Sequence, residues 1–442
     1  MIARPARKRL TPLGALGIFC GIAGAFVGGS MARAQTVAIT HAKLVIGDGS
    51  GPVDNGTVLI QGGKVIAAGA VVVVPAGVKV IDAQGKWVTP GLVVAVTDLG
   101  LVDVGAVEES NDSDADKAPF SAALDLSAAI NPDDLPIQVS RAGGVTRAAV
   151  APIGTGSIFG GQGAIIDLGS DPDAVTMARA FQYVELGETG ARRAGGSRAA
   201  TYAVLFNALS EAQELALAPA GARRDDVLLT RRDAIALIPV TTGKQPLYVH
   251  VERASDIRMV LGLKREFPLL RLVIVGAAEG WLVAAELAKS GVPVLATPLT
   301  DLPNTFEQLG STQSNVGRMK AAGVKVSLGA FGDQPRYAPQ YAGNLVGLAK
   351  VPGASGLTWG QAFAAISSGP AEALGMGERF GSLRPGRAGD AVIWDGDPLE
   401  VATGVVRVFI DGVEQPLTNH QTRLRDRYSA PGEGDLPKAY EW

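Results

Sequence analysis

Short runs of alternating apolar and polar residues fill the chain between residues 37 and 88. These runs are rich in β-branched residues, and glycine-containing turn pairs such as Gly62-Gly63 separate them. Alternation with a period of two is typical of strands that bury one face, and such glycine pairs favour tight turns between strands. The pattern therefore predicts several short β-strands at this end of the chain.

Similar strand-like runs return near the other end, over residues 381–398 and 405–416. Strands at both ends of a chain, separated by a long section of different character, favour one small domain to which both ends contribute. We predict a β-sandwich built from residues 35–88 and 383–420. The remaining residues, 421–442, are predicted to form a C-terminal tail.

The central section, residues 89–382, alternates apolar runs of strand length with amphipathic helical patterns such as residues 256–267 and 281–291. The candidate strands are residues 93–96, 145–151, 247–251, 272–275, 292–296 and 324–328. Repeated βα units predict an α/β fold, namely a (β/α)8 TIM-like barrel, although the periodicity alone equally allows an open doubly wound sheet. The glycine-rich stretch 154–164 and the acidic run 108–117 are predicted to be loops.

The first 34 residues have the composition of a targeting segment. Basic residues at positions 4, 7, 8 and 9 precede an apolar run from Leu13 to Val27, and Ala32-Arg33-Ala34 follows as a small-x-small cleavage site. This order predicts a secretory signal peptide over residues 1–34 and a periplasmic mature protein. The alternative is a membrane anchor, but the run is short and rich in glycine, so we expect no stable anchor.

Charge and cysteine content limit the partners of the mature chain. Its single cysteine, Cys20, lies in the predicted signal peptide, so no disulfide or cysteine metal site is expected after cleavage. Cleavage removes five basic residues and no acidic ones, which lowers the net charge from -3 to about -8. An acidic chain without a basic run disfavours nucleic acid as a partner. A small-molecule substrate or ligand is the expected partner.

Four motifs in order along the chain resemble those of the metal-dependent amidohydrolase superfamily, most closely its imidazolonepropionase-like branch. They are GTVLIQGGKVIAAG at 56–69, VIDAQGKWVTPGL at 80–92, RAGGVTRAAVAP at 141–152 and SSGPAEALGMGERFGSLRPGRAGDAVIWDGDP at 367–398. The resemblance covers nearly all of the chain after residue 34. It implies the barrel with a split β-domain, and hydrolysis of C–N bonds in amide, cyclic amide or dipeptide-like substrates.

The resemblance also implies a divalent metal ion at the barrel mouth, where the ion activates water. The ligands of the superfamily are two histidines on strand 1, one histidine each on strands 5 and 6, and an aspartate on strand 8. On strand 1 the pattern PGLIDxHxHxG is replaced by PGLVVAVTD, so Val96 and Asp98 stand where the histidines belong. Only Asp98 of this pair could still contact a metal.

The other ligand positions are also changed. His250 stands at the strand 5 position, with Glu252 two residues later on the same side of the strand. Gly276 occupies the strand 6 position. At strand 8, Phe331 replaces the aspartate, and Asp333 follows two residues later.

Two interpretations of this altered site remain open. In the first, the protein is a C–N hydrolase in which Asp98 and His250 act as catalytic groups or, with Asp333, as ligands of one Zn, Mn or Mg ion, while Glu252 and Phe331 contact substrate. In the second, no metal is bound, and the protein is a non-catalytic homologue that binds a ligand or serves as a structural subunit. A homo-oligomer, or a hetero-oligomer with an active paralogue, fits the second interpretation.

Overall fold

The computed structural model describes most of the chain after the predicted signal peptide, namely residues 36–152, 154–219, 221, 225–329 and 334–429. The predicted signal peptide, Phe331 and Asp333 therefore lie outside the described residues. Within the described part, no helix has both the length and the apolar character needed to cross a membrane.

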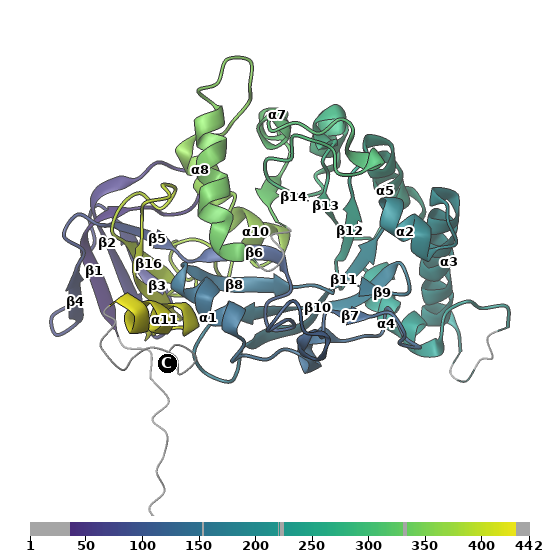
Figure 1. The fold of residues 1–442 in the computed structure, drawn as a ribbon, viewed down its shortest axis with the longest axis horizontal. Helices are drawn as coiled ribbons and strands as arrows, with labels where there is room; N and C mark the ends of the chain where they lie inside the picture. The colour runs from purple at the N-terminus through teal and green to yellow at the C-terminus, as the bar shows by residue number, and fades with distance from the viewer. Residues whose placement is uncertain (1–35, 153, 220, 222–224, 330–333, 430–442) are drawn as a thin grey trace, which may run out of the picture. The chain divides into compact units, whose positions relative to one another are not determined.

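Strands from both ends of the chain form one mixed eight-stranded sheet (Figure 1). Its strands are β1 (Val37–Leu44), β2 (Val53–Gln61), β3 (Lys64–Gly69), β4 (Lys79–Asp82), β5 (Trp87–Pro90), β16 (Ala391–Trp394), β17 (Val405–Ile410) and β18 (Val413–Gln415). The order is β18-β17-β16-β5-β1-β2-β3, and β4 pairs with β1. Apolar side chains from both ends, including Ile39, Ile60 and Phe409, are buried in one core. The small β-domain built from both termini is thus confirmed.

A second eight-stranded sheet forms a nearly closed barrel (Figure 1). Its strands are β6 (Leu92–Thr97), β8 (Val145–Val150), β10 (Phe159–Asp167), β11 (Val175–Glu185), β12 (Leu247–Val251), β13 (Leu272–Gly276), β14 (Val294–Ala296) and β15 (Val326–Leu328), in this order from one edge to the other. Neighbouring strands are parallel except at β10, which runs antiparallel to both β8 and β11. The predicted barrel architecture is confirmed, with this one antiparallel strand as a departure.

The prediction that the glycine-rich stretch 154–164 is a loop was wrong. Most of it belongs to β10, whose residues are all buried. A side chain at Gly163 would overlap the ring of Phe181 on β11, and a Cβ at Gly160 would stand 2.9 Å from the ring of Pro152. These glycines therefore allow close packing inside a strand, whereas sequence reasoning took them as a sign of a turn.

A short loop segment bridges the remaining gap of the barrel, between β15 and β6. The carbonyl of Ile366 accepts from the amide of Val93 on β6 at 3.0 Å, and the carbonyl of Ala365 accepts from Leu328 on β15 at 2.9 Å. Directly after this segment, α10 (Ser368–Ala373) contacts β6, β14 and β15. Ala371 and the nearby Phe380 join the apolar cluster of the barrel interior.

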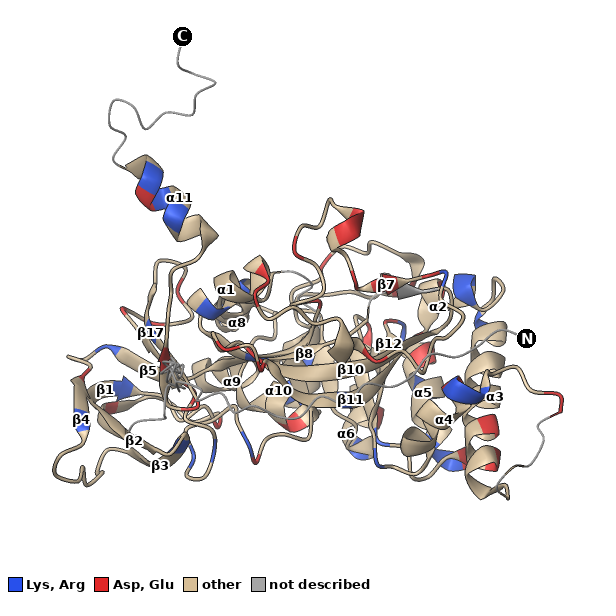
Figure 2. Ribbon diagram, turned by 90° about the horizontal axis from the view of Figure 1, so that it is seen from below, with Lys and Arg blue, Asp and Glu red and all other residues tan. Residues whose placement is uncertain are grey.

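The other helices lie mostly after barrel strands. They are α1 (Leu135–Ala142), α2 (Gly187–Arg193), α3 (Arg198–Leu217), α4 (Arg231–Thr241), α5 (Ala254–Glu266), α6 (Ala284–Ser290), α7 (Asn315–Ala321), α8 (Ala338–Leu348), α9 (Trp359–Ala364) and α11 (His420–Ser429). The acidic run after β6 holds a 3₁₀ turn at Glu108–Ser110 and the two-residue strand β7 (Asp114–Ala115), which pairs with β9 (Gly154–Thr155). Acidic residues gather near β7 in Figure 2.

A buried ion pair joins the barrel to the β-domain. Arg147 of β8 donates from Nε and Nη2 to the two carboxylate oxygens of Asp390, at 2.7 and 2.9 Å, and Asp390 directly precedes β16. Arg147 also pairs with Asp411 at 2.7 Å. Burial disfavours the charged guanidinium, but these carboxylates outweigh burial and raise the pKa of Arg147. Two carboxylates from the C-terminal strands of the β-domain therefore hold the barrel wall through one arginine.

Candidate functional site

Three neighbouring parallel strands bring polar side chains to one rim of the barrel. Glu185 at the end of β11 pairs in register with His250 on β12, and Val251 pairs with Gly276 at the end of β13. Because these strands are parallel, their carboxyl ends meet at the same rim. This rim is where barrel enzymes place their functional groups.

His250 is held between two carboxylates, one on each ring nitrogen. Its Nδ1 lies 2.7 Å from Oε1 of Glu185, and its Nε2 lies 3.2 Å from Oε1 of Glu252. The imidazole is one-quarter exposed, whereas the two carboxylate side chains are 11% and 5% exposed. The ring therefore faces the barrel mouth while its partners are largely shielded from water.

This arrangement favours the doubly protonated form of the ring. Burial alone would lower the pKa of His250, but the negative charge and hydrogen bond of Glu185, together with the hydrogen bond of Glu252, raise that pKa well above 6.5. An imidazolium donates from both nitrogens, which matches an acceptor at each. The two carboxylates therefore favour the imidazolium form of His250, which offsets part of their negative charge.

The carboxylate of Glu252 fills the space next to Gly276. One oxygen accepts from the amide of Ala278 at 2.7 Å, and the other accepts from Nε2 of Gln308 at 3.3 Å. Gly276 has a φ of +89°, and a Cβ on it would stand 2.8 Å from Oε1 of Glu252 and 2.9 Å from its Cδ. A histidine at this position would meet both a strained backbone and an occupied space.

The described residues supply few of the ligands that the family resemblance implies for a divalent metal. A histidine ligand offers a metal the lone pair of a neutral ring nitrogen, whereas both nitrogens of His250 face carboxylate acceptors. Val96 is buried and apolar, and Gly276 has no side chain. Within the ranges that the structure covers, no group of three or more His, Cys, Asp or Glu side chains could hold a metal ion.

Asp98 lies on the loop after β6, close to other acidic groups. It is buried, and its carbonyl accepts from the amide of Leu101 at 2.9 Å. Its charge helps to raise the pKa of Asp134 to about 7, an effect caused mainly by burial of Asp134 and by its hydrogen bond with Asp103. The structure thus places Asp98 near the Asp103–Asp134 pair, and its catalytic or metal-binding role stays a prediction.

Of the remaining candidates, Glu252 lies at the site, whereas two lie outside the described residues. Glu252 contacts His250 directly, so its predicted place at the site has a geometric basis, but contact with substrate stays a prediction. Phe331 and Asp333 lie outside the described residues, and their roles stay predictions as well.

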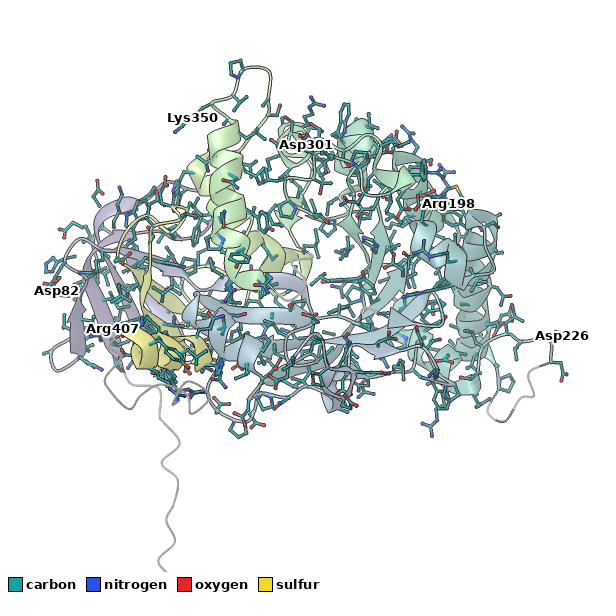
Figure 3. The ribbon with its side chains drawn as sticks, in the orientation of Figure 1. Asp82, Arg198, Asp226, Asp301, Lys350 and Arg407 are labelled. Atoms are coloured by element: carbon teal, nitrogen blue, oxygen red, sulfur yellow. The ribbon has the colours of Figure 1, made fainter. Side chains whose placement is uncertain are left out.

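Sequence reasoning missed Glu185, which makes the shorter hydrogen bond to His250. Its strand, β11, was not among the predicted strands, although the segment FQYVEL before α2 contains aromatic and β-branched residues that strands favour. A second missed group is Arg198 at the start of α3 (Figure 3), which pairs with Asp256 at 2.9 Å and with Glu307 at 3.1 Å. This network links α3, α5 and the segment before α7 beside the rim.

Comparisons with known proteins agree with this architecture. Residues 267–414 match the model of the amidohydrolase family. The chain is 24% identical over 387 residues to the amidohydrolase tasK of Hapsidospora irregularis, and the match covers 76% of this chain but only 37% of that longer protein.

Solved structures extend the similarity to nearly the whole chain. A crystal structure of an amidohydrolase from Thermotoga maritima MSB8 matches with a TM-score of 0.74 and 26% identity, covering 86% of this chain and 99% of that one. A molinate hydrolase matches in fold, with a TM-score of 0.54 and 19% identity over 92% of this chain and 98% of its own. The barrel, the β-domain from both termini and these matches together show that the chain has the amidohydrolase fold and is similar in sequence to amidohydrolases.

Proposed function

We propose that this protein binds a small molecule at the barrel mouth without cleaving it through metal-activated water. The molecule expected from the family's chemistry carries a C–N linkage of the amide, cyclic amide or dipeptide type. The proposal rests mainly on the Glu185–His250–Glu252 triplet, in which both ring nitrogens of His250 face carboxylates.

The triplet supplies a fixed polar surface in place of a metal site. The imidazolium of His250 neutralises negative charge at the rim, and its one-quarter exposure leaves part of the ring open to a ligand. Gln308 is tied to Glu252, so it helps to hold that carboxylate against the ring. Binding to such a preformed surface requires little rearrangement of these side chains.

A second candidate function is C–N bond hydrolysis, the activity of the family. It is favoured by the 26% identity to the amidohydrolase from Thermotoga maritima over 86% of this chain. In that case an altered site would use His250 and Asp98, as the sequence predicts, and the side chains at the rim would have to rearrange.

Location and assembly follow from the same proposal. The N-terminal segment supports export, so we propose a periplasmic protein. A barrel that binds without metal-assisted hydrolysis is also suited to pair with an active paralogue as a subunit of a hetero-oligomer.

Metal content and turnover separate the two functions. Mature protein, residues 35–442, is purified and loaded in turn with Zn, Mn and Mg, and its metal content is measured. It is then assayed on a panel of N-acyl amino acids, dipeptides and cyclic amides, and thermal shift records binding of each compound. His250→Ala and Lys350→Gln, an exposed lysine at the loop after α8 (Figure 3), serve as test and control variants.

The proposal predicts less than stoichiometric metal, no turnover, and stabilisation by at least one compound that His250→Ala loses and Lys350→Gln keeps. Stoichiometric metal that disappears in His250→Ala together with turnover would establish the hydrolase instead. Absence of both turnover and binding across the panel would contradict both functions.

A further inference from the structure

A cavity of about 630 Å³ lies at the end of the barrel opposite the His250 rim. Pro246, Arg271, Pro293 and Lys325 line it. These four residues precede β12, β13, β14 and β15, directly in each case. Because these strands are parallel and adjacent, their amino ends meet at one end of the barrel. The cavity is therefore separate from the barrel mouth.

Four basic side chains from four segments border this cavity. Arg271 and Lys325 lie in the loops just before β13 and β15, while Lys264 and Lys320 lie in the last turns of α5 and α7. All four are exposed, and none of them forms an ion pair with another residue that the structure describes. The cavity thus gathers positive charge that the protein itself leaves unneutralised.

The local structure explains only half of this charge. Lysines in the last turn of a helix interact favourably with the helix dipole, which accounts for Lys264 and Lys320. Arg271 and Lys325 precede strands and have no such role. Gly375 lies close to the guanidinium of Arg271: a Cβ added to Gly375 would stand 3.2 Å from Nη2 of Arg271. A larger residue at position 375 would crowd the arginine at the cavity.

The acidic residues of the lining do not cancel the positive charge. Asp48 and Glu372 are the two carboxylates that border the cavity. Asp48 is already bound by Arg384 at 3.2 Å and by the Ser50 hydroxyl at 2.5 Å. Four basic side chains thus border the cavity together with two carboxylates, one of which already pairs with an arginine.

We propose that this cavity binds a small organic molecule that carries a multiply charged oxyanion, either a phosphate or a set of carboxylates. Its volume falls in the range of roughly 300 to 1,000 Å³ that is usual for small-molecule sites. Arginine and lysine bind both kinds of oxyanion through charge-assisted hydrogen bonds. The site is independent of the proposed function of the barrel mouth, since it lies at the other end of the strands.

Calorimetric titration of the mature protein with inorganic pyrophosphate and with citrate tests this proposal. The test variant combines Arg271→Gln with Lys325→Gln, and the matched control combines Lys117→Gln with Lys350→Gln, which removes the same charge from exposed positions elsewhere. We expect saturable binding of at least one anion that weakens as salt is added, because salt screens exposed charges. The dissociation constant should rise at least tenfold in the test variant and less than twofold in the control.

The two probes distinguish the sources of the oxyanion. Tighter binding of pyrophosphate indicates a phosphorylated ligand, and tighter binding of citrate indicates a polycarboxylate. If the test variant misfolds by circular dichroism, Lys264→Gln combined with Lys320→Gln replaces it, because both lysines are exposed on helices. No saturable binding of either anion, or an equal loss in test and control variants, would overturn the proposal.

Discussion

Replacement of Gly276 by alanine measures how firmly Glu252 occupies the rim. The backbone at Gly276 has a φ of +89°, and a new Cβ would stand 2.8 to 2.9 Å from the carboxylate of Glu252. The left-handed backbone costs about 1–2 kcal/mol for a residue with a Cβ. The overlap adds about 1–3 kcal/mol, as overpacking does elsewhere. Gly276→Ala should therefore lower the free energy of unfolding by about 2–5 kcal/mol.

Gly323 provides a matched control. Its φ is +88°, and nothing lies within 4 Å of the position its Cβ would take. Gly323→Ala should therefore cost only the backbone contribution, about 1–2 kcal/mol. Urea unfolding of both variants, and of Gly276→Ala combined with Glu252→Ala, separates the two contributions through a double-mutant cycle.

The cycle should show that Glu252→Ala removes about 1–3 kcal/mol of the cost of Gly276→Ala, which is the overlap contribution. Equal costs for Gly276→Ala and Gly323→Ala would refute the reasoning. So would a coupling energy below about 0.5 kcal/mol, the level at which independent sites add.

Two further predictions concern buried charges. Arg147→Met leaves Asp390 buried without its cation and should lower the free energy of unfolding in urea by about 3–5 kcal/mol. As a control, Arg258→Met breaks a half-exposed pair with Glu286 and should lower it by less than about 1 kcal/mol. Similar losses for both variants would contradict the structural role of Arg147. Asp134 has a pKa raised from 3.8 to about 7, so its contribution to stability is complete below pH 3.8 and is lost as pH rises through about 7. The free energy of unfolding of Asp134→Asn relative to wild type should therefore rise between pH 4 and pH 7, and a pH-independent difference would count against the raised pKa.

The fold was predictable because its signals are local and repeated. Runs of alternating apolar and polar residues near both termini predict the β-domain, and repeated βα units in the centre predict the barrel. Motifs such as VTPGL indicate where along the chain the first barrel strand begins. The strand β10 was missed because sequence reasoning took its glycines as a sign of a turn. In the fold, Gly163 instead makes room for the ring of Phe181.

The site was only half predictable. His250 and Glu252 follow from one strand and its alternation, so sequence alone placed them together. Glu185 comes from β11, 65 residues earlier, and its meeting with His250 depends on the register between two strands. The family resemblance put Gly276 at the position of a histidine, but the sequence could not show that Glu252 occupies the adjacent space, since that depends on the positive φ and on the amide of Ala278.

The protonation of His250 tests the central claim most directly. The chain has only three histidines, so nitrogen NMR of labelled mature protein can resolve each imidazole. Assignment follows from His41→Gln and His420→Gln variants, because both side chains are exposed and lie outside the barrel.

We predict that both ring nitrogens of His250 carry protons at pH 7, that its titration midpoint lies well above 6.5, and that Glu185→Gln lowers that midpoint. Equimolar Zn should leave its nitrogen shifts unchanged. A neutral His250 at pH 7, or a ring nitrogen that takes the shift of a metal-bound imidazole when Zn is added, would contradict the account.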